Sequence, residues 1–392
     1  MIFTNPSIFF VLLWLSTGLL YSLHLSNVLL EMKYETYLLL FISCMGFLLA
    51  YLLYFITVKK PILYPKYSNS LLLKEISNMK VYKKIKYLWL FWIVMIIFEI
   101  LFEQNLPLIA LFGIGPYIGY ADFGISGLHG FLNSISFVLI TYHFLKYKAS
   151  SSKIDKYVVI FFILWTILIV NRQQLVSIFL ELMFLHFITT KIKFKQILKV
   201  FFIIMLFITI FGFIGDMRSG KEHFLAIASP TFDYPEYLPS GFLWIYIYMV
   251  SPLNNTNYNI ENFEPIYIPI SSTILLFPSF LRDQIESTLG IKSNPVYLVH
   301  ESLNMSSFFP TLLNDFGLEL IFFILFFTAL FFLYVMHKAN YSLRYVFVLS
   351  IILHAIAMSI FTNFLTHIVF VMQIFIVLFI FKSNKLQVKY DT

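Results

Sequence analysis

The chain has 392 residues, of which 60% are hydrophobic and only 12% are charged; a soluble domain has about 25% charged residues. Apolar runs of roughly 18 residues or more recur, which excludes an ordinary soluble fold and indicates a helical membrane protein. The formal net charge of +7 does not indicate nucleic acid, because the basic residues gather between apolar runs, where they set topology and contact anionic lipids. The single cysteine, Cys44, excludes a disulfide within the chain.

Ten apolar segments predict ten membrane-spanning helices. This arrangement places both termini in the cytoplasm and puts 20 of the 23 lysines in cytoplasmic connections, in accord with the positive-inside rule. The expected fold is therefore an all-α polytopic membrane protein that forms a single domain over residues 1–392. The segments are 8–23, 36–57, 87–104, 130–147, 157–171, 174–189, 197–215, 316–336, 344–362 and 366–382.

Segment 157–190 is predicted to form two short helices rather than one. A single helix would be about 50 Å long, which is too long for a hydrocarbon core of about 30 Å. It would also place the lysines that follow on the outer side. With two short helices, the turn that carries Arg172 lies below the outer surface of the membrane. An arginine inside the membrane is costly unless it faces a wet cavity or a partner, which favours a functional role over simple snorkelling.

Residues 216–315 form the largest predicted extramembrane element, a periplasmic loop. Two apolar runs inside it, 241–250 and 266–281, are short for spans. If both crossed the membrane, the link between them would be cytoplasmic, yet it contains no lysine or arginine. We therefore expect interfacial or re-entrant segments that fold back over the bilayer. Such a lid would suit a lipid-linked substrate.

Three of the four arginines, Arg172, Arg218 and Arg282, are expected on the outer side, against the positive-inside rule. A guanidinium binds phosphate in a bidentate manner, which gives these residues a chemical reason to be there. For Arg218, phosphate binding and an ordinary polar helix end are weighed equally. For Arg282, a local ion pair with Asp283 is slightly favoured over a binding role.

Asp315, His300 and Asp216 are the candidates for activating a hydroxyl group on the outer side. Asp315 is expected at the N-terminus of the eighth span, where a carboxylate complements the helix dipole, so capping is weighed slightly ahead of general-base catalysis. His300 lies nearby in sequence and can act as a base near neutral pH. Ionisable residues inside spans are expected to hydrogen-bond between helices. They are Glu99, His143, Glu181 and His186.

Three stretches carry a resemblance to a known family. They are Asn171-Arg172-Gln173-Gln174, Gly215-Asp216-Met217-Arg218-Ser219-Gly220, and Asn304 through Asp315-Phe316-Gly317. With about ten spans, inside termini and one dominant outer loop, the chain resembles bacterial O-antigen polymerases of the Wzy type, also called oligosaccharide repeat unit polymerases. Family members often have a glycine three residues after the last motif, where this chain has Leu320.

The resemblance implies a GT-C-like membrane glycosyltransferase in the bacterial inner membrane, with its active face in the periplasm. Its substrates would be an undecaprenyl-pyrophosphate-linked glycan donor and acceptor, which it would join into O-antigen or capsule-type polysaccharide. By motif, Arg172 and Arg218 would bind the pyrophosphate, with Arg282 a weaker addition. Asp315, His300 and Asp216 remain alternatives for activating the acceptor. Arginines could supply the charge stabilisation, so no metal or other cofactor is expected, and a chain-length regulator is an implied partner.

Two alternative functions stay open. A flippase or transporter for lipid-linked saccharides would usually show internal repeats and binding charges near the bilayer midplane, and neither is evident in the sequence. An O-antigen ligase would have nearly the same architecture as the polymerase, so hydropathy does not separate them. A Gram-positive capsule polymerase is also compatible.

Overall fold

The computed structural model describes residues 2–58, 69–119, 122–190, 194–289 and 296–381. Within these ranges the protein is helical and has no β-strand, although Ser26 and Pro230 form an isolated bridge. The helices in chain order are η1 Ile2–Thr4, α1 Pro6–Ser22, α2 Tyr34–Thr57, α3 Asn69–Ile76, α4 Met79–Glu103, α5 Pro107–Leu111, α6 Leu128–Ser150, α7 Lys153–Leu168, α8 Arg172–Thr189, α9 Phe194–Ser219, α10 Lys221–Ala228, α11 Gly241–Asn259, η2 Ile260–Asn262, α12 Ile270–Thr273, η3 Ile274–Leu276, α13 Ser279–Leu289, α14 Phe309–Ala339, α15 Leu343–Met358, η4 Phe364–Thr366 and α16 Ile368–Ile380.

Each of the ten predicted spans forms a helix. They correspond to α1, α2, α4, α6, α7, α8, α9, α14, α15 and α16. In the described residues, α2, the stretch Met79–Leu111, α6 and α14 are long and apolar enough to cross a membrane, and α1, α15 and α16 are apolar but shorter. The fold is therefore compatible with a helical membrane protein.

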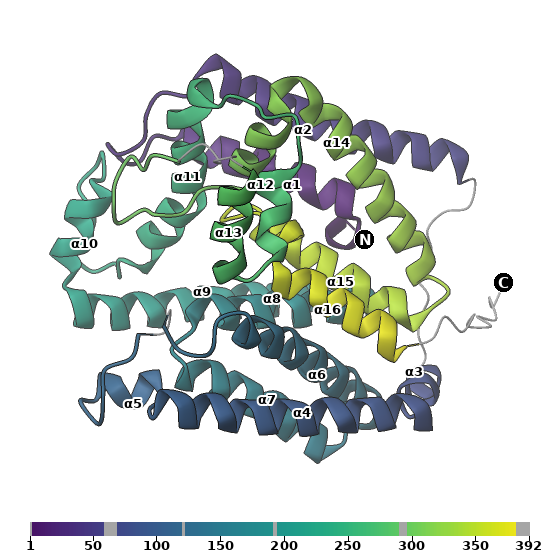
Figure 1. The fold of residues 1–392 in the computed structure, drawn as a ribbon. Coiled ribbons are helices and arrows are strands. Elements are labelled where there is room, and N and C mark those ends of the chain that lie inside the picture. The colour runs from purple at the N-terminus through teal and green to yellow at the C-terminus, as the bar shows by residue number, and fades with distance from the viewer. Residues whose placement is uncertain (1, 59–68, 120–121, 191–193, 290–295, 382–392) are drawn as a thin grey trace.

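The connections between helices gather at two opposite ends of the bundle. Figure 1 places α3 and the ends of α2 and α16 at one end, here called the α3 end, and α5 and α10 at the other, here called the α10 end. At the α3 end, the Lys84 ammonium donates a hydrogen bond of 2.5 Å to the Phe379 carbonyl. The Tyr142 hydroxyl donates one of 3.3 Å to the Ile76 carbonyl. The α3 end thus joins segments that the sequence places in or beside the cytoplasm.

The chain breaks between α7 and α8, as the length argument predicts. Val170 lies in the break with a φ of 56°, a conformation that is costly for a β-branched residue. The Asn171 side chain accepts a hydrogen bond of 2.9 Å from the Gln174 backbone N–H and so caps α8. Arg172 is therefore the first residue of a new helix, and its side chain is exposed.

Ionisable side chains inside the bundle pair between helices. This confirms the expected interhelical hydrogen bonds for Glu99, His143 and Glu181, three of the four residues named from the sequence. A buried carboxylate is tolerated when such a partner satisfies it. The pairs are Glu99–His129 at 2.9 Å, His143–Asp155 at 2.6 Å and Glu181–Gln373 at 2.5 Å.

Helices α9 and α11 cross at two glycines. A Cβ atom added at Gly241 would lie 2.5 Å from the Ile208 carbonyl oxygen, and one at Gly212 would lie 2.6 Å from the Gly241 nitrogen. Only glycine allows the two backbones to approach so closely. The first apolar run of the outer segment, which forms the start of α11, is therefore fixed against the seventh predicted span.

Candidate functional site

The Asp-Phe-Gly stretch lies at a break inside α14. Gly317 has φ 61° and ψ 176°, a conformation that essentially only glycine adopts. The break interrupts the helical hydrogen bonds, and the Asn314 carbonyl accepts one of 2.8 Å from the Ile266 backbone N–H. The second apolar run of the outer segment is thereby tied to α14 where it begins.

Asp315 lies just before the break at Gly317, at the start of the second part of α14, where the sequence predicts a helix start. Its side chain, however, does not cap this helix. The Asp315 carboxylate is fully buried and accepts hydrogen bonds from the backbone N–H groups of Ser271, at 2.6 Å, and Ser272, at 2.8 Å, and from the Ser272 hydroxyl. Asp315 is thus a cap for α12, a different helix, and it fastens the second apolar run to α14.

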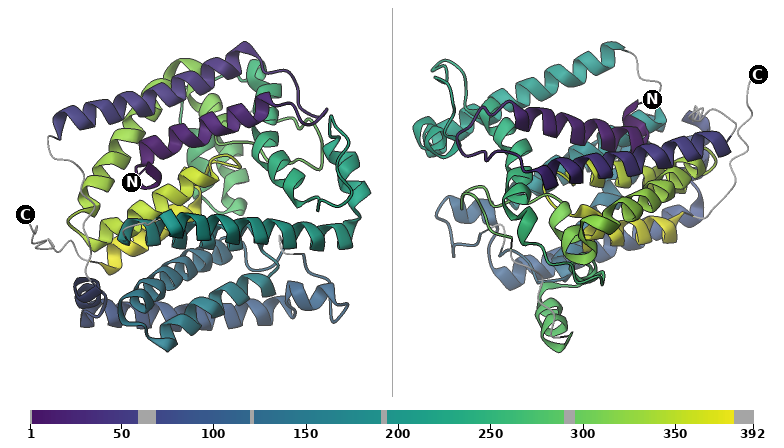
Figure 2. Two further views of the ribbon diagram at one scale, coloured as in Figure 1. Left: turned by 180° about the vertical axis from the view of Figure 1, so that it is seen from behind. Right: turned by 90° about the horizontal axis from the view of Figure 1, so that it is seen from above.

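Arg282 lies near the start of α13, which projects from the body of the protein (Figure 2, right). Its guanidinium donates hydrogen bonds to the carbonyls of Phe277, at 2.8 Å, and Leu275, at 3.5 Å. Arg282 also lies close enough to His367, which directly precedes α16, for the two side chains to interact electrostatically. The side chain of Asp283, the partner weighed from the sequence, lies outside the described residues.

The connection between α15 and α16 packs on the first turns of α14. The Asn363 amide donates a hydrogen bond of 2.8 Å to the Thr311 hydroxyl, and the Phe308 N–H donates one of 3.0 Å to the Ser359 carbonyl. Thr311 is four residues before Asp315 and shares its face of the helix. We call the group Ser271, Arg282, Thr311, Asp315, Asn363 and Thr366 the outer junction.

Several oxygen atoms of the outer junction are buried without a hydrogen-bond partner in the part of the chain that the structure describes. They are Ser271 Oγ, Asn363 Oδ1 and Thr366 Oγ. Most buried polar atoms in proteins are paired, so such a group needs an explanation, and a polar ligand or ordered water provides one. Asn363 and Thr366 had no role in the sequence analysis.

Arg172 belongs to the same end of the bundle as the outer junction. Two residues further along α8, the Gln174 amide donates a hydrogen bond of 3.1 Å to the Asn133 side chain on α6. One turn earlier on α6, a Cβ atom at Gly130 would lie 3.7 Å from the Ile368 side chain. The starts of α8, α6 and α16 therefore lie close together, and Ile368 follows the connection that carries Asn363.

Asp216 and His300 lie in other settings. Asp216 Oδ2 accepts a hydrogen bond of 3.0 Å from the Ser240 N–H, which joins the end of α9 to the start of α11. Its Oδ1 atom is buried with no hydrogen-bond partner among the described residues. His300 Nδ1 accepts one of 3.1 Å from the Ser302 N–H within a local turn. The side chain of Arg218 lies outside the described residues.

The buried polar face of α11 is a structural feature that the sequence analysis missed. Five polar residues in its second half are at most 1% exposed. They hold two segments of the outer end, residues 28–33 and residues 297–305, mainly through hydrogen bonds to backbone groups. The residues are Asn254, Asn255, Thr256, Asn257 and Asn259. The close spacing of these polar residues along the sequence was the signal that could have indicated a hydrogen-bonding role.

Replacing Asn255 by alanine is expected to loosen the segment that carries His300. Its amide donates to the carbonyls of Leu303 and Met305, both at 2.8 Å, and accepts from the Val299 N–H at 3.0 Å. Removing these bonds leaves buried backbone groups unsatisfied, at a cost of about 1–3 kcal/mol. Hydrogen exchange in residues 297–305 should accelerate at least tenfold. The exposed Asn262→Ala variant should not change it, and equal rates in both variants would contradict this role.

Comparisons of the chain with protein-family models, with curated proteins and with solved structures find no match. In the described residues, no group of three or more histidine, cysteine, aspartate or glutamate side chains is placed to hold a metal ion. The class of protein therefore rests on the fold: an all-helical protein with several apolar helices of membrane-spanning length.

Proposed function

We propose that this protein is a membrane glycosyltransferase that joins undecaprenyl-pyrophosphate-linked oligosaccharide repeat units into O-antigen or capsule-type polysaccharide on the outer face of the bacterial inner membrane. The observation that supports the proposal best is the outer junction. There two backbone carbonyls hold Arg282, and three buried oxygen atoms of the same group lack partners in the described residues, at the end of the bundle where the sequence places the outer face.

The proposed reaction transfers a glycan between two lipid carriers. The acceptor hydroxyl attacks the anomeric carbon of the donor glycan, the bond from that carbon to the pyrophosphate oxygen breaks, and a new glycosidic bond forms. The hydroxyl proton passes to a base, and undecaprenyl pyrophosphate leaves with the bonding electrons. Negative charge grows on the leaving group, and a cation already fixed in a poorly hydrated site stabilises it.

The arginines suit this role by their hydrogen-bonding capacity. A guanidinium has five N–H donors, and the bonds from Arg282 to two carbonyls hold it in place while leaving donors for a phosphate. Arg172, which is exposed at the start of α8, adds a second cation at the same end. Both positions support a pyrophosphate site rather than a purely structural role.

The surroundings of the three candidate bases differ. Both carboxylate oxygens of Asp315 accept hydrogen bonds from α12, and Nδ1 of His300 is occupied by the Ser302 N–H. Asp216 retains one carboxylate oxygen without a hydrogen-bond partner in the described part of the chain. Within the proposal, Asp315 is a positioning residue, and Asp216 and His300 remain alternatives for accepting the hydroxyl proton.

Replacing Arg282 by lysine should reduce long-chain glycan at least tenfold while leaving the amount of protein in the membrane unchanged. A lysine is a point charge that cannot hold two carbonyls and a phosphate in one plane. The measurement is the glycan ladder on a gel from cells in which this chain is the only candidate polymerase. Arg344→Lys, at the α3 end, is the matched control and should keep the ladder.

The glycan that remains in the variants distinguishes the proposed polymerase from a ligase and from a flippase. Single repeat units on the core with no longer chains indicate a polymerase defect, whereas a core without any repeat unit indicates a ligase. Lipid-linked units retained on the inner leaflet indicate a flippase. A normal ladder in both Arg282→Ala and Arg172→Ala would reject the proposal.

A further inference from the structure

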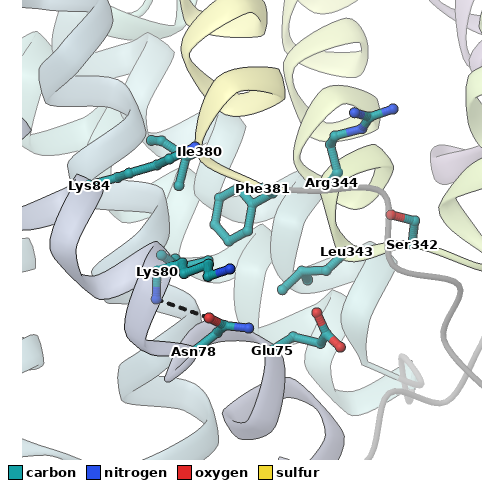
Figure 3. Close-up of a pocket in the computed structure, with 10 residues that line it drawn as sticks. Glu75, Asn78, Lys80, Lys84, Ser342, Leu343, Arg344, Ile380 and Phe381 are labelled. Atoms are coloured by element: carbon teal, nitrogen blue, oxygen red, sulfur yellow. Dashed lines mark hydrogen bonds between the residues drawn. The ribbon is translucent and has the colours of Figure 1, made fainter.

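A small cavity of about 70 Å³ lies at the α3 end, far from the outer junction. It is bounded by the connection from α3 to α4, the start of α15 and the end of α16 (Figure 3). Figure 3 shows Lys80 and Lys84 on one side and Ser342 and Arg344 on the opposite side, with the ring of Phe381 between them. Its volume admits one compact polar group rather than a whole lipid.

Cations outnumber anions among the charged residues that line the cavity. The lining includes three cations, Lys80, Lys84 and Arg344, and one carboxylate, Glu75. Lys84 is held at the edge by the bond to the Phe379 carbonyl and by its position 4.1 Å over the Phe379 ring. A cation excess in a partly enclosed space favours an anion, because the field is less screened there than on an open surface.

Polar groups at the start of α15 are incompletely used by hydrogen bonds in the described part of the chain. Ser342 precedes α15 as its N-cap residue, is only 5% exposed, and makes no side-chain bond to the first turn of the helix. Arg344 donates to the Tyr345 hydroxyl at 3.0 Å, but its Nε atom is buried and has no partner there. The backbone N–H groups of a helix start favour an anion, and Ser342 and Lys80 lie where they could contact it.

The two helices α4 and α16, which contribute to the cavity lining, carry exposed aromatic side chains that favour a lipid as the source of this anion. Tyr82 and Tyr87 on α4 and Phe375 and Phe379 on α16 all expose large fractions of their surface. The acyl chains of a phospholipid could cover this surface while its headgroup contacts the cavity. Basic pockets between membrane helices bind anionic headgroups in this way.

We propose that this cavity binds a phosphate group, supplied by an anionic phospholipid of the leaflet at the α3 end. The proposal stands apart from the glycan chemistry, because it uses the opposite end of the molecule. Lys80, Ser342 and the start of α15 contact the phosphate, Lys84 closes one side, and Arg344 contributes charge at the rim.

Lipid binding to the full-length protein tests the proposal. The protein is purified in a neutral detergent, and the apparent Kd for phosphatidylglycerol is measured by native mass spectrometry beside phosphatidylcholine and inorganic phosphate. The double variant Lys80→Gln/Arg344→Gln should raise the Kd for phosphatidylglycerol about tenfold. Lys86→Gln, an exposed lysine on α4 outside the cavity lining, should leave it unchanged. Thermal unfolding of each variant without lipid checks that it is folded.

Each outcome decides the proposal. A loss confined to the cavity variants supports the site. Competition by inorganic phosphate at similar concentration would keep the phosphate chemistry but assign the site to a soluble ligand. Equal binding of phosphatidylglycerol and phosphatidylcholine, or an equal loss in Lys86→Gln, would overturn the proposal.

Discussion

Replacing Gly317 by alanine is expected to lower the free energy of unfolding by about 3 kcal/mol. The φ of 61° and ψ of 176° at this residue belong to a region that costs a side-chain-bearing residue about 1–3 kcal/mol. An added Cβ atom would also lie 3.1 Å from Pro265 Cγ and would meet the Glu319 carboxylate. If the strain were relieved by straightening α14, the Asn314 carbonyl would lose the N–H of Ile266. Thermal and denaturant unfolding in detergent micelles measure the effect.

Gly130→Ala is the matched control for this variant. Gly130 lies in α6, and an added Cβ atom would make ordinary contacts of 3.7 and 3.8 Å with Ile368 and Val369. Alanine is favoured over glycine in a helix by up to about 1 kcal/mol, so this variant should be as stable as the parent or slightly more stable. Equal stability of the two alanine variants would show that the break at Gly317 is not strained.

The helices could be predicted because their signals are local. Each of the ten expected spans is a predominantly apolar run, and length argued against one continuous helix between Tyr157 and Thr190. The break at Val170 and the start of α8 at Arg172 confirm that argument. The helical turns from Phe309 to the break at Gly317 lie outside the predicted span, although Pro310 in the first turn is a common sign of a helix start.

The partners of the site residues could not be predicted, because they are distant in sequence. Asp315 pairs with Ser271 and Ser272, more than forty residues earlier. Nothing in the local pattern distinguishes a carboxylate that caps its own helix from one that caps another. The contact between Asn363 and Thr311 is equally non-local. These pairings depend on how α12, α14 and the connection before α16 pack.

The burial of the asparagines of α11 could not be predicted either, because it also depends on partners that are distant in sequence. The apolar run of this helix ends at Val250, and the polar residues that follow look like an exposed loop. They are buried because backbone groups of residues 28–33 and 297–305 surround them and need hydrogen-bond partners. These two segments are thus held in place by side-chain amides of α11 that hydrogen-bond to backbone groups.

Replacing Asp315 by alanine should also lower the free energy of unfolding, by about 3 kcal/mol. The change leaves two buried backbone N–H groups, those of Ser271 and Ser272, without an acceptor, and each such loss costs about 1–3 kcal/mol. Asp315→Asn should cost about half as much, because its amide oxygen satisfies one N–H while its amide nitrogen faces the other. Unfolding in micelles measures both variants, and the exposed Glu319→Ala on the same helix is the control.

The same substitutions separate anchoring from general-base catalysis. If Asp315 holds α12 in place, Ser272→Ala and Asp315→Ala share part of their cost, and the double variant loses less stability than the two single losses added together. Under the proposed polymerase function, the glycan ladder should then shorten as stability is lost. A general base would behave differently. Asp315→Asn would abolish the ladder in a protein that unfolds like the parent, and that result would assign Asp315 a catalytic role.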